Sequence, residues 1–289
     1  MPPCEGDAAT EGVPSTPGAV EVAPSEYQAI YDKCRTFVHA EKDNQSGNWE
    51  LMNGSTDFEQ DSLRLESSKY KPYMDANPDI ICVRGRLRFP GVMPRQVLEL
   101  ILNLETRTQW DSQMESGEKR VSYDTSSREG HCEGMLTMDV AALQYKGQRP
   151  FVSARDLCLL RFTEDLSENK DESHLALYAQ SIPHEAVPVD DSGSYVRAEL
   201  HQCGYLAQLC EDTSGKFYPS FYTDVTYISS LDFKGSIPAT FTNVILRQQP
   251  ATLLDMRRLL SAGKEWVGSD YYANAGLTPD GSDKQCAIM

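Results

Sequence analysis

Residues 232–238, which read Asp-Phe-Lys-Gly-Ser-Ile-Pro, separate two kinds of pattern in the C-terminal part of the chain. Before them, residues 220–233 are rich in β-branched and aromatic side chains, as is typical of a strand. After them, apolar side chains recur at helical spacing: Phe241, Val244, Ile245, Leu253, Met256 and Leu259. The stretch therefore predicts a strand, a tight turn and a long last helix, which Pro250 should kink because it removes a backbone hydrogen bond.

Upstream of this turn the pattern is mostly that of strands, interrupted by two helices. A capping box at Ser25 and Gln28 predicts a helix to about Ala40, and a second helix opens at Met93-Pro94 with proline in its first turn. The order of elements predicts an α+β domain with a curved antiparallel sheet of about nine strands around the last helix. The expected strands lie near 48–53, 59–71, 80–89, 118–124, 131–142, 154–163, 173–181, 195–209 and 220–233.

Both ends of the chain differ in composition from the part between them. Residues 1–24 are rich in Pro, Gly, Ala, Ser and Glu and hold few large apolar side chains, so we expect a disordered N-terminal tail. Residues 265–289 are polar and rich in Gly and Asp, so we expect a flexible tail there as well. The folded domain is expected to span residues 25–264.

Charge and cysteine usage exclude several classes of protein. The 289 residues include 43 acidic and 27 basic side chains, a net charge of −16, and no cluster of Lys or Arg stands out. Such a chain repels phosphate backbones and anionic headgroups, so we expect no nucleic-acid partner. The eight cysteines form no C-x-x-C pair, which favours reduced thiols over disulfides or a zinc site. With no secretory signal and no apolar stretch of transmembrane length, we expect a cytoplasmic protein.

Three segments together resemble the steroidogenic acute regulatory protein-related lipid transfer (START) domain family. They are residues 100–111, which end in Trp-Asp, residues 152–161, which contain Ser-Ala-Arg-Asp, and the turn at 232–238. The resemblance implies a helix-grip fold, in which a U-shaped sheet encloses an internal lipid tunnel capped by the C-terminal helix. It also implies a single bound sterol, phospholipid or ceramide, and burying that lipid removes about 0.8 kcal/mol of exposure cost for each methylene.

The same resemblance indicates a polar pair inside the tunnel. In sterol-binding members an acid and an arginine on neighbouring strands meet at the tunnel's end, and these positions match Asp139 and Arg161. Asp139 lies in a run of Met, Leu, Val and Ala, while Arg161 shares strand parity with two leucines. If both are buried they should pair, because an isolated buried charge is costly. Alternatively, Arg161 ends its strand in water and Asp139 pairs locally. We expect the pair to anchor the lipid's hydroxyl or phosphate.

Residues 144–151 match the loop at the mouth of the family's tunnel. They carry two aromatic and two basic side chains, and Tyr145 and Phe151 would dip into a membrane interface if this loop opened there. An ordinary solvated loop is the alternative. For Arg155 and Asp156, which follow this loop, we expect a structural role.

Residues 286–289, Cys-Ala-Ile-Met, fit the prenylation pattern, and the terminal Met favours a farnesyl group on Cys286. A single lipid chain gives marginal, reversible attachment, so we expect a protein that associates reversibly with membranes.

These observations together predict a monomer that binds one lipid and transfers it between membranes, without a cofactor or metal. No G-x-S-x-G, H-E-x-x-H, Walker or G-x-G-x-x-G pattern is present. The histidines lack metal-ligand spacing: His39, His131, His174, His184 and His201. We therefore expect no enzyme activity. Two alternatives stay open: a lipid sensor or scaffold that moves no lipid, and an enzyme of the same superfold.

Overall fold

A computed structural model describes residues 20–21, 23–42, 49–51, 64–68, 82–125, 134–147, 152–168, 173–213, 220–235, 237 and 239–260. Its helices are α1 (Glu26–Lys42), α2 (Pro94–Leu102) and α3 (Ala239–Leu260), with a short 3-10 helix η1 (Arg107–Gln109) after α2. The strands are β1 (Val20–Glu21), β2 (Glu50–Leu51), β3 (Arg64–Ser68), β4 (Cys82–Pro90), β5 (Met114–Tyr123), β6 (Met135–Tyr145), β7 (Ala154–Asp165), β8 (His174–Ser181), β9 (Tyr195–Arg197), β10 (Glu199–Glu211) and β11 (Phe221–Asp232).

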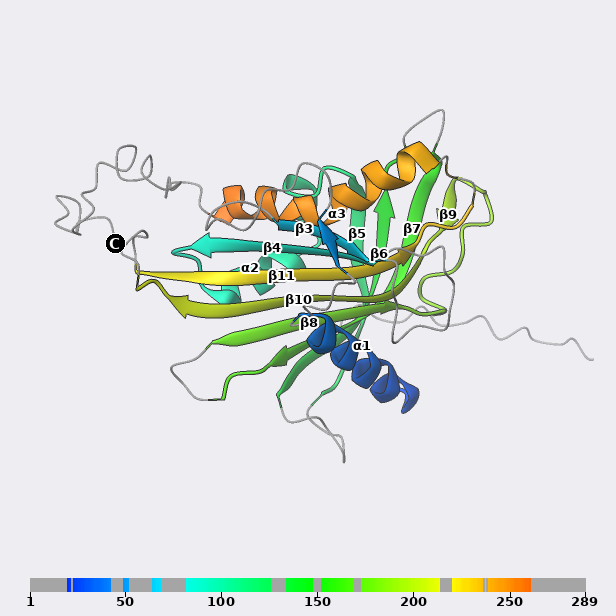
Figure 1. Cartoon of the computed structure of the whole chain (residues 1–289). Coiled ribbons are helices and arrows are strands. Elements are labelled where there is room, and N and C mark those ends of the chain that lie inside the picture. Colours follow the sequence, from blue (N-terminus) through cyan, green and yellow to red (C-terminus); the bar gives the residue numbers. More distant parts are fainter. Residues whose placement is uncertain are drawn as a thin grey trace, which may run out of the picture.

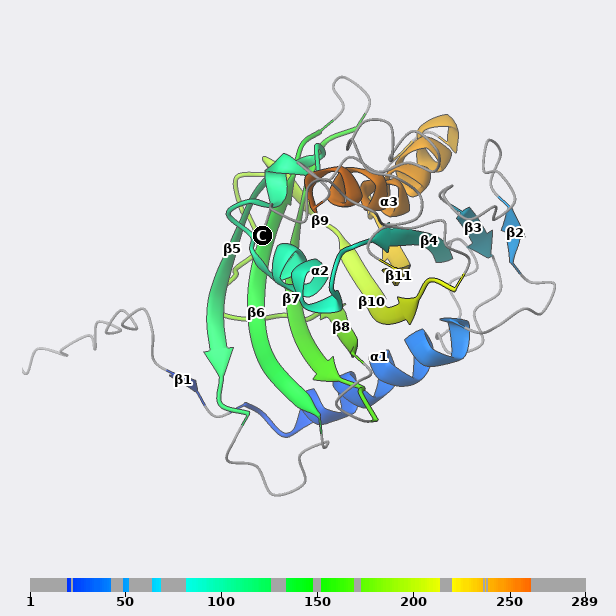
Figure 2. The same cartoon turned by 90° about the vertical axis from the view of Figure 1, so that its left-hand side faces the viewer.

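The strands form one curved sheet in the order β1-β5-β6-β7-β8-β10-β11-β4-β3-β2, with β9 paired to β7 (Figure 1). Strand β1 pairs with β5 in parallel, and so does β9 with β7. The other strand pairs are antiparallel. The sheet curves around α2 and α3, while α1 lies outside the curve (Figure 2). This arrangement confirms the predicted helix-grip fold.

The sheet has 11 strands among the described residues, whereas about nine were expected. The predicted strand 195–209 is wrong as a single strand. Its first part, β9, pairs with β7, and Ala198 then donates its N–H to the Asp156 carbonyl before β10 turns to pair with β8 and β11. The other extra strand, β1, falls inside residues 1–24, for which we expected a disordered tail.

Helix α1 packs against the outer face of the sheet through a buried apolar stripe. Its members are Tyr27, Tyr31, Cys34, Phe37 and Val38. The helix approaches closely because β10 carries Gly204, where a Cβ would collide with the Val38 side chain. An ion pair fixes the helix as well: Arg35 lies 3.0 Å from the buried Glu164 carboxylate, which also accepts a hydrogen bond from the Tyr178 hydroxyl.

Arginines alternate along β4 at positions 84, 86 and 88, and the first two hold the end of α1. Arg84 donates to the Glu41 carbonyl at 2.6 Å, and Arg86 donates to the Lys42 carbonyl. The last carbonyls of a helix lack intrahelical partners, so these guanidiniums supply them. Arg84 is also paired with the buried Glu66 at 2.6 Å, and Arg88 stacks over the Tyr222 ring. Arg84 and Arg86 therefore cap α1, whereas Arg88 packs against β11.

Helices α2 and α3 close the inner face of the sheet. Leu253 and Met256 of α3 are fully buried there, and Pro250 lies over Gly85 of β4. No helix among the described residues is both long and apolar enough to cross a membrane. The curved sheet and the helices α2 and α3 thus enclose the space between them (Figure 2).

Candidate functional site

A cavity lies between the inner face of the sheet and helices α2, η1 and α3. Its volume is about 140 Å³, roughly ten times the space that one buried water needs, so it is more than a packing defect. Much of its wall is aliphatic: Ile101, Leu143, Leu157, Leu159, Leu177 and Leu200. An apolar chamber of this kind, with a few polar groups, is the usual form of a small-molecule site.

The structure pairs Asp139 with Arg161 at the wall of this chamber. They are direct neighbours across β6 and β7, and two hydrogen bonds of 2.7 and 2.8 Å join the guanidinium to both carboxylate oxygens. Asp139 is 6% exposed and Arg161 3%, so the alternative in which Arg161 ends its strand in water is wrong. Arg161 lines the cavity, and its Nη1 atom has no hydrogen-bond partner in the part of the chain that the structure describes.

A second pocket reaches the same ion pair from another side. It has a volume of about 550 Å³ and lies between residues 102–105, β5 and β6. Asp139 and Arg161 both line it, and Arg161 also lines the first cavity. The ion pair therefore stands at the boundary between the two spaces.

Tyr145 is the last residue of β6, so the expectation that it sits in a mouth loop does not hold. Its side chain lines the cavity, and its hydroxyl accepts a hydrogen bond of 3.3 Å from Arg107. Burial raises the pKa of Tyr145 above its ordinary value, so the hydroxyl stays protonated. Phe151 and Cys286 lie outside the described residues.

Sequence reasoning missed Arg107, which η1 carries into the chamber. Its Nε atom lies 3.4 Å from the Asp111 carboxylate, and its guanidinium is 5.0 Å from the Trp110 ring. Burial opposes its charge, but Tyr145 and Asp111 outweigh burial and raise the pKa of Arg107. One sequence feature could have indicated Arg107. It precedes Trp110 and Asp111 by three and four residues, a spacing that places all three side chains on one helical turn.

Two further tyrosines line the wall beside Arg107. Tyr205 of β10 and Tyr227 of β11 are direct neighbours, and their ring centroids are 4.6 Å apart. Burial raises the pKa of both above the ordinary tyrosine value. Neighbouring Cys203 is also buried in the wall, and burial raises the pKa of its thiol to about 12. At neutral pH these groups are uncharged, so the charged side chains of the cavity wall are Arg107, Asp111, Lys146, Arg155 and Arg161.

Arg155 ties β7 to the turn that leads into α3. Its guanidinium donates to the carbonyls of Phe233 at 3.3 Å and Lys234 at 3.0 Å, and Asp156 is paired with Arg197 at 2.7 Å. Both residues therefore have the structural role that was predicted. Arg155 holds the turn at Phe233 and Lys234, which leads into α3.

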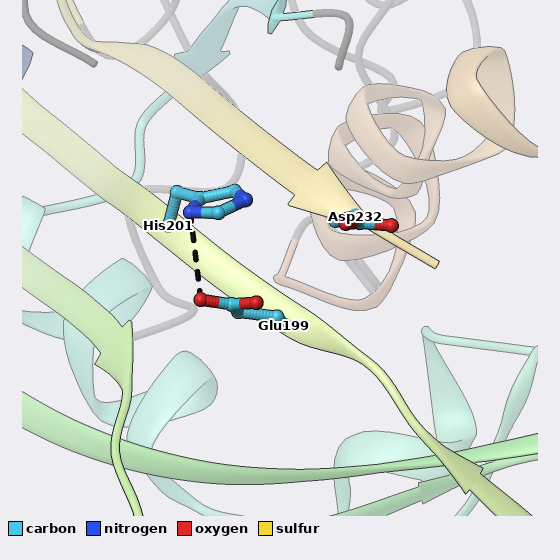
Figure 3. Close-up of side chains that lie close together, drawn as sticks. All are labelled: Glu199, His201 and Asp232. Carbon is cyan, nitrogen blue, oxygen red and sulfur yellow. Dashed lines mark ion pairs between the residues drawn. The ribbon is translucent and has the colours of Figure 1, made fainter. Parts of the chain in front are cut away.

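Glu199, His201 and Asp232 gather near the same turn (Figure 3), where their ligand atoms lie within 4.8 Å of one another. Residues of these types can bind a metal. Here the Lys234 ammonium lies 2.9 Å from Glu199 and 2.8 Å from Asp232, and its hydrogen bond to Asp232 raises the pKa of Lys234. Lys234 has φ of 48°, so this ion pairing stabilises a left-handed residue at the base of α3. We interpret these ion pairs as structural contacts that stabilise the turn before α3.

The fold, the chamber and the turn before α3 agree with the result of a comparison with protein families, in which the START domain matches residues 18–262. The chain belongs to the START domain family. START domains bind a lipid ligand, and proteins that contain them are generally lipid transporters rather than enzymes. The family therefore establishes lipid binding and transport as the general function of this fold.

Solved structures of START proteins share the fold at low sequence identity. The crystal structure of human STARD10 is 15% identical, with a TM-score of 0.56, over 90% of this chain and 86% of that one. Human StAR-related lipid transfer protein 5 is 13% identical, with a TM-score of 0.58, over 83% of this chain and 98% of that one. No curated protein matches the sequence. At these identities the likeness to solved structures concerns the fold alone.

Proposed function

We propose that this START domain binds one lipid of the sterol, phospholipid or ceramide class and transfers it between membranes. The observation that carries the proposal is a chamber with aliphatic walls and one buried guanidinium atom, Nη1 of Arg161, that lacks a partner among the described residues. Aliphatic walls favour hydrocarbon, and a buried unsatisfied donor favours a ligand oxygen. An amphipathic lipid supplies both.

The Asp139–Arg161 pair is the proposed anchor for the lipid's hydroxyl or phosphate. Asp139 fixes two of the three guanidinium nitrogens, which leaves Nη1 to donate to the ligand. Three other cations line the same cavity, and each already has a partner. Arg107 contacts Asp111 and Tyr145, Lys146 donates to the Ser112 carbonyl, and Arg155 donates to the carbonyls of Phe233 and Lys234. The second pocket adjoins the anchor, so a polar group bound there can remain close to water.

Native mass spectrometry after exposure to a mixed lipid extract tests the binding proposal directly. The protein should carry one additional lipid mass. The double variant Asp139→Leu/Arg161→Leu, which leaves no buried charge behind, should bind that lipid about tenfold more weakly. The matched control is Arg95→Leu/Glu99→Leu, since this ion pair is exposed on α2. If the buried-pair variant binds as tightly and selectively as the parent protein, the anchor is wrong.

Transfer and sensing differ in one measurable property. A transfer protein speeds the exchange of a lipid between donor and acceptor vesicles, whereas a pure sensor binds the lipid without speeding its exchange. We expect acceleration, because α3 closes the chamber on one side and can admit a lipid without unfolding the sheet. Stoichiometric binding with no acceleration would favour the sensor or scaffold alternative.

The proposal also includes membrane contact through Phe151 and through a farnesyl group on Cys286. We further propose that the protein is a monomer, located in the cytoplasm and reversibly associated with membranes. We expect protein isolated from its native cell to carry the mass of one farnesyl group, and the Cys286→Ser variant to lack it. An unmodified C-terminal peptide in the native protein would rule out this route to the membrane. Tyr145 is proposed to contact the lipid from within the chamber, where it lies beside Arg107.

A further inference from the structure

The inner surface of α3 changes character along its length. Leu253 and Met256 are fully buried and apolar, as the inner face of a covering helix should be. One turn earlier, Gln248, Gln249 and Thr252 line the cavity. Polar side chains at this position are unexpected in a helix whose only role is to exclude water.

The two glutamines present one acceptor and one donor that have no partner. Gln248 Oε1 and Gln249 Nε2 are buried, and neither atom makes a hydrogen bond within the described part of the chain. The Gln249 Oε1 atom accepts a hydrogen bond of 3.4 Å from the Tyr227 hydroxyl. The Thr252 hydroxyl is satisfied locally by the Gln249 carbonyl at 2.6 Å. Buried polar atoms without partners are rare in native proteins and call for a ligand or a water.

These glutamines lie on a different wall of the cavity from Arg161. Helix α3 packs over β4, and β11, β10 and β8 stand between β4 and the Arg161 strand in the sheet order. Three strand spacings from β7 to β11 amount to roughly 14 Å along the sheet. Leu177 and Ala179 of β8 line the wall between them. The chamber therefore presents polar groups on two walls, at Arg161 and at the α3 glutamines, and Tyr205 and Tyr227 line the wall beside the glutamines.

We propose that Gln248 and Gln249 form a site for a hydroxyl group of the bound lipid, in addition to the polar group held at Arg161. The inference rests on the proposed lipid-binding function and names the chemistry of its ligand. A hydroxyl donates to Gln248 Oε1 and accepts from Gln249 Nε2 at the same time. A phosphate oxygen only accepts, and a quaternary ammonium does neither, so both leave an unsatisfied glutamine atom.

Two kinds of lipid carry a second polar group of this type. One is a sterol with an additional hydroxyl at the end of its side chain, which would span the chamber with one hydroxyl at each end. The other is a phospholipid whose headgroup bears hydroxyls, with the phosphate at Arg161. In both cases the hydroxyl contacts α3 itself and supplies the partner that Gln248 Oε1 and Gln249 Nε2 lack among the described residues.

Binding to two matched pairs of lipids tests the site. One pair is cholesterol and cholesterol hydroxylated at the end of its side chain; the other is phosphatidylmethanol and phosphatidylglycerol, which carry the same charge and the same acyl chains. We expect the full chain to bind the hydroxylated member of one pair about tenfold more tightly, and that pair identifies the lipid class.

The preference should fall to within about twofold in Gln248→Met/Gln249→Met, because methionine fills the same space without hydrogen bonds. Gln248→Met alone breaks no hydrogen bond among the described residues. This single variant therefore replaces the double variant in the test if the double variant is unstable. Gln208→Met, on the exposed part of β10, is the matched control and should keep the preference. Equal binding within both pairs, or a preference that survives Gln248→Met/Gln249→Met, overturns the inference while leaving lipid binding intact. Failure to bind any of the four lipids overturns the inference, and the proposed function falls with it if no lipid from the mixed extract binds either.

Discussion

Replacing Asp139 with leucine is expected to lower the free energy of unfolding by about 3–5 kcal/mol, because the charge of Arg161 would stay buried without its partner. The two hydrogen bonds of 2.7 and 2.8 Å are the only ones that the described residues give this guanidinium. With 3% of Arg161 exposed, water cannot replace the lost carboxylate in the observed conformation. Equilibrium urea denaturation measures the loss.

The double variant Asp139→Leu/Arg161→Leu should recover most of that stability, since a well-packed apolar pair often matches a buried ion pair. Glu99→Leu is the control: its ion pair with Arg95 leaves the two side chains 63% and 82% exposed, so the change should be below about 0.5 kcal/mol. If Asp139→Leu costs no more than Glu99→Leu, then Arg161 reaches water in solution, and the second pocket that adjoins it is the route.

Much of the fold was predictable because its elements carry strong local patterns. The strand 154–163 was expected from a run of apolar side chains, and β7 spans Ala154–Asp165. Helix α1 was expected from Ser25 to about Ala40 and spans Glu26–Lys42. Capping residues, proline positions and apolar periodicity act over a few neighbouring residues, so a single sequence contains them.

Elements that depend on distant pairing were not predictable in the same way. The split between β9 and β10 arises because Ala198 bonds to the Asp156 carbonyl of β7, some forty residues earlier in the chain. Likewise, Tyr145 reads as a loop residue locally, but its pairing with Arg155 extends β6 to include it. Local sequence does not specify either partner.

In the candidate site, too, local sequence patterns predict some residues and not others. Strand parity alone places Arg161 on the face of Leu157 and Leu159, and the cost of a buried charge then requires a partner such as Asp139. Arg107 and Gln249 are different, because η1, β11 and α3 bring them to one chamber from segments more than a hundred residues apart. The spacing of Arg107 to Trp110 and Asp111 indicates a shared helical turn, but no local pattern shows that this turn and Gln249 line one cavity, so the structure is needed to identify them.

Gly85→Val is expected to displace α3 and thereby speed lipid exchange about tenfold, with a loss of about 1–3 kcal/mol in the free energy of unfolding. A Cβ at Gly85 would lie 2.6 Å from the Pro250 Cβ and 3.3 Å from a Leu253 methyl group. The Pro250 ring cannot rotate away as a flexible side chain would, so the helix itself must move. Transfer of a fluorescent lipid between vesicles measures the exchange rate.

Gly204→Val separates this effect from a general loss of stability. Gly204 lies on the opposite face of the sheet, where an added side chain would collide with Val38 of α1 and leave α3 untouched. Both variants should be destabilised, but only Gly85→Val should speed exchange. Equal acceleration in the two variants would mean that the chamber opens by loosening of the whole sheet. Because each glycine sits beneath a different helix, the comparison decides whether the movement of α3 alone controls access to the lipid.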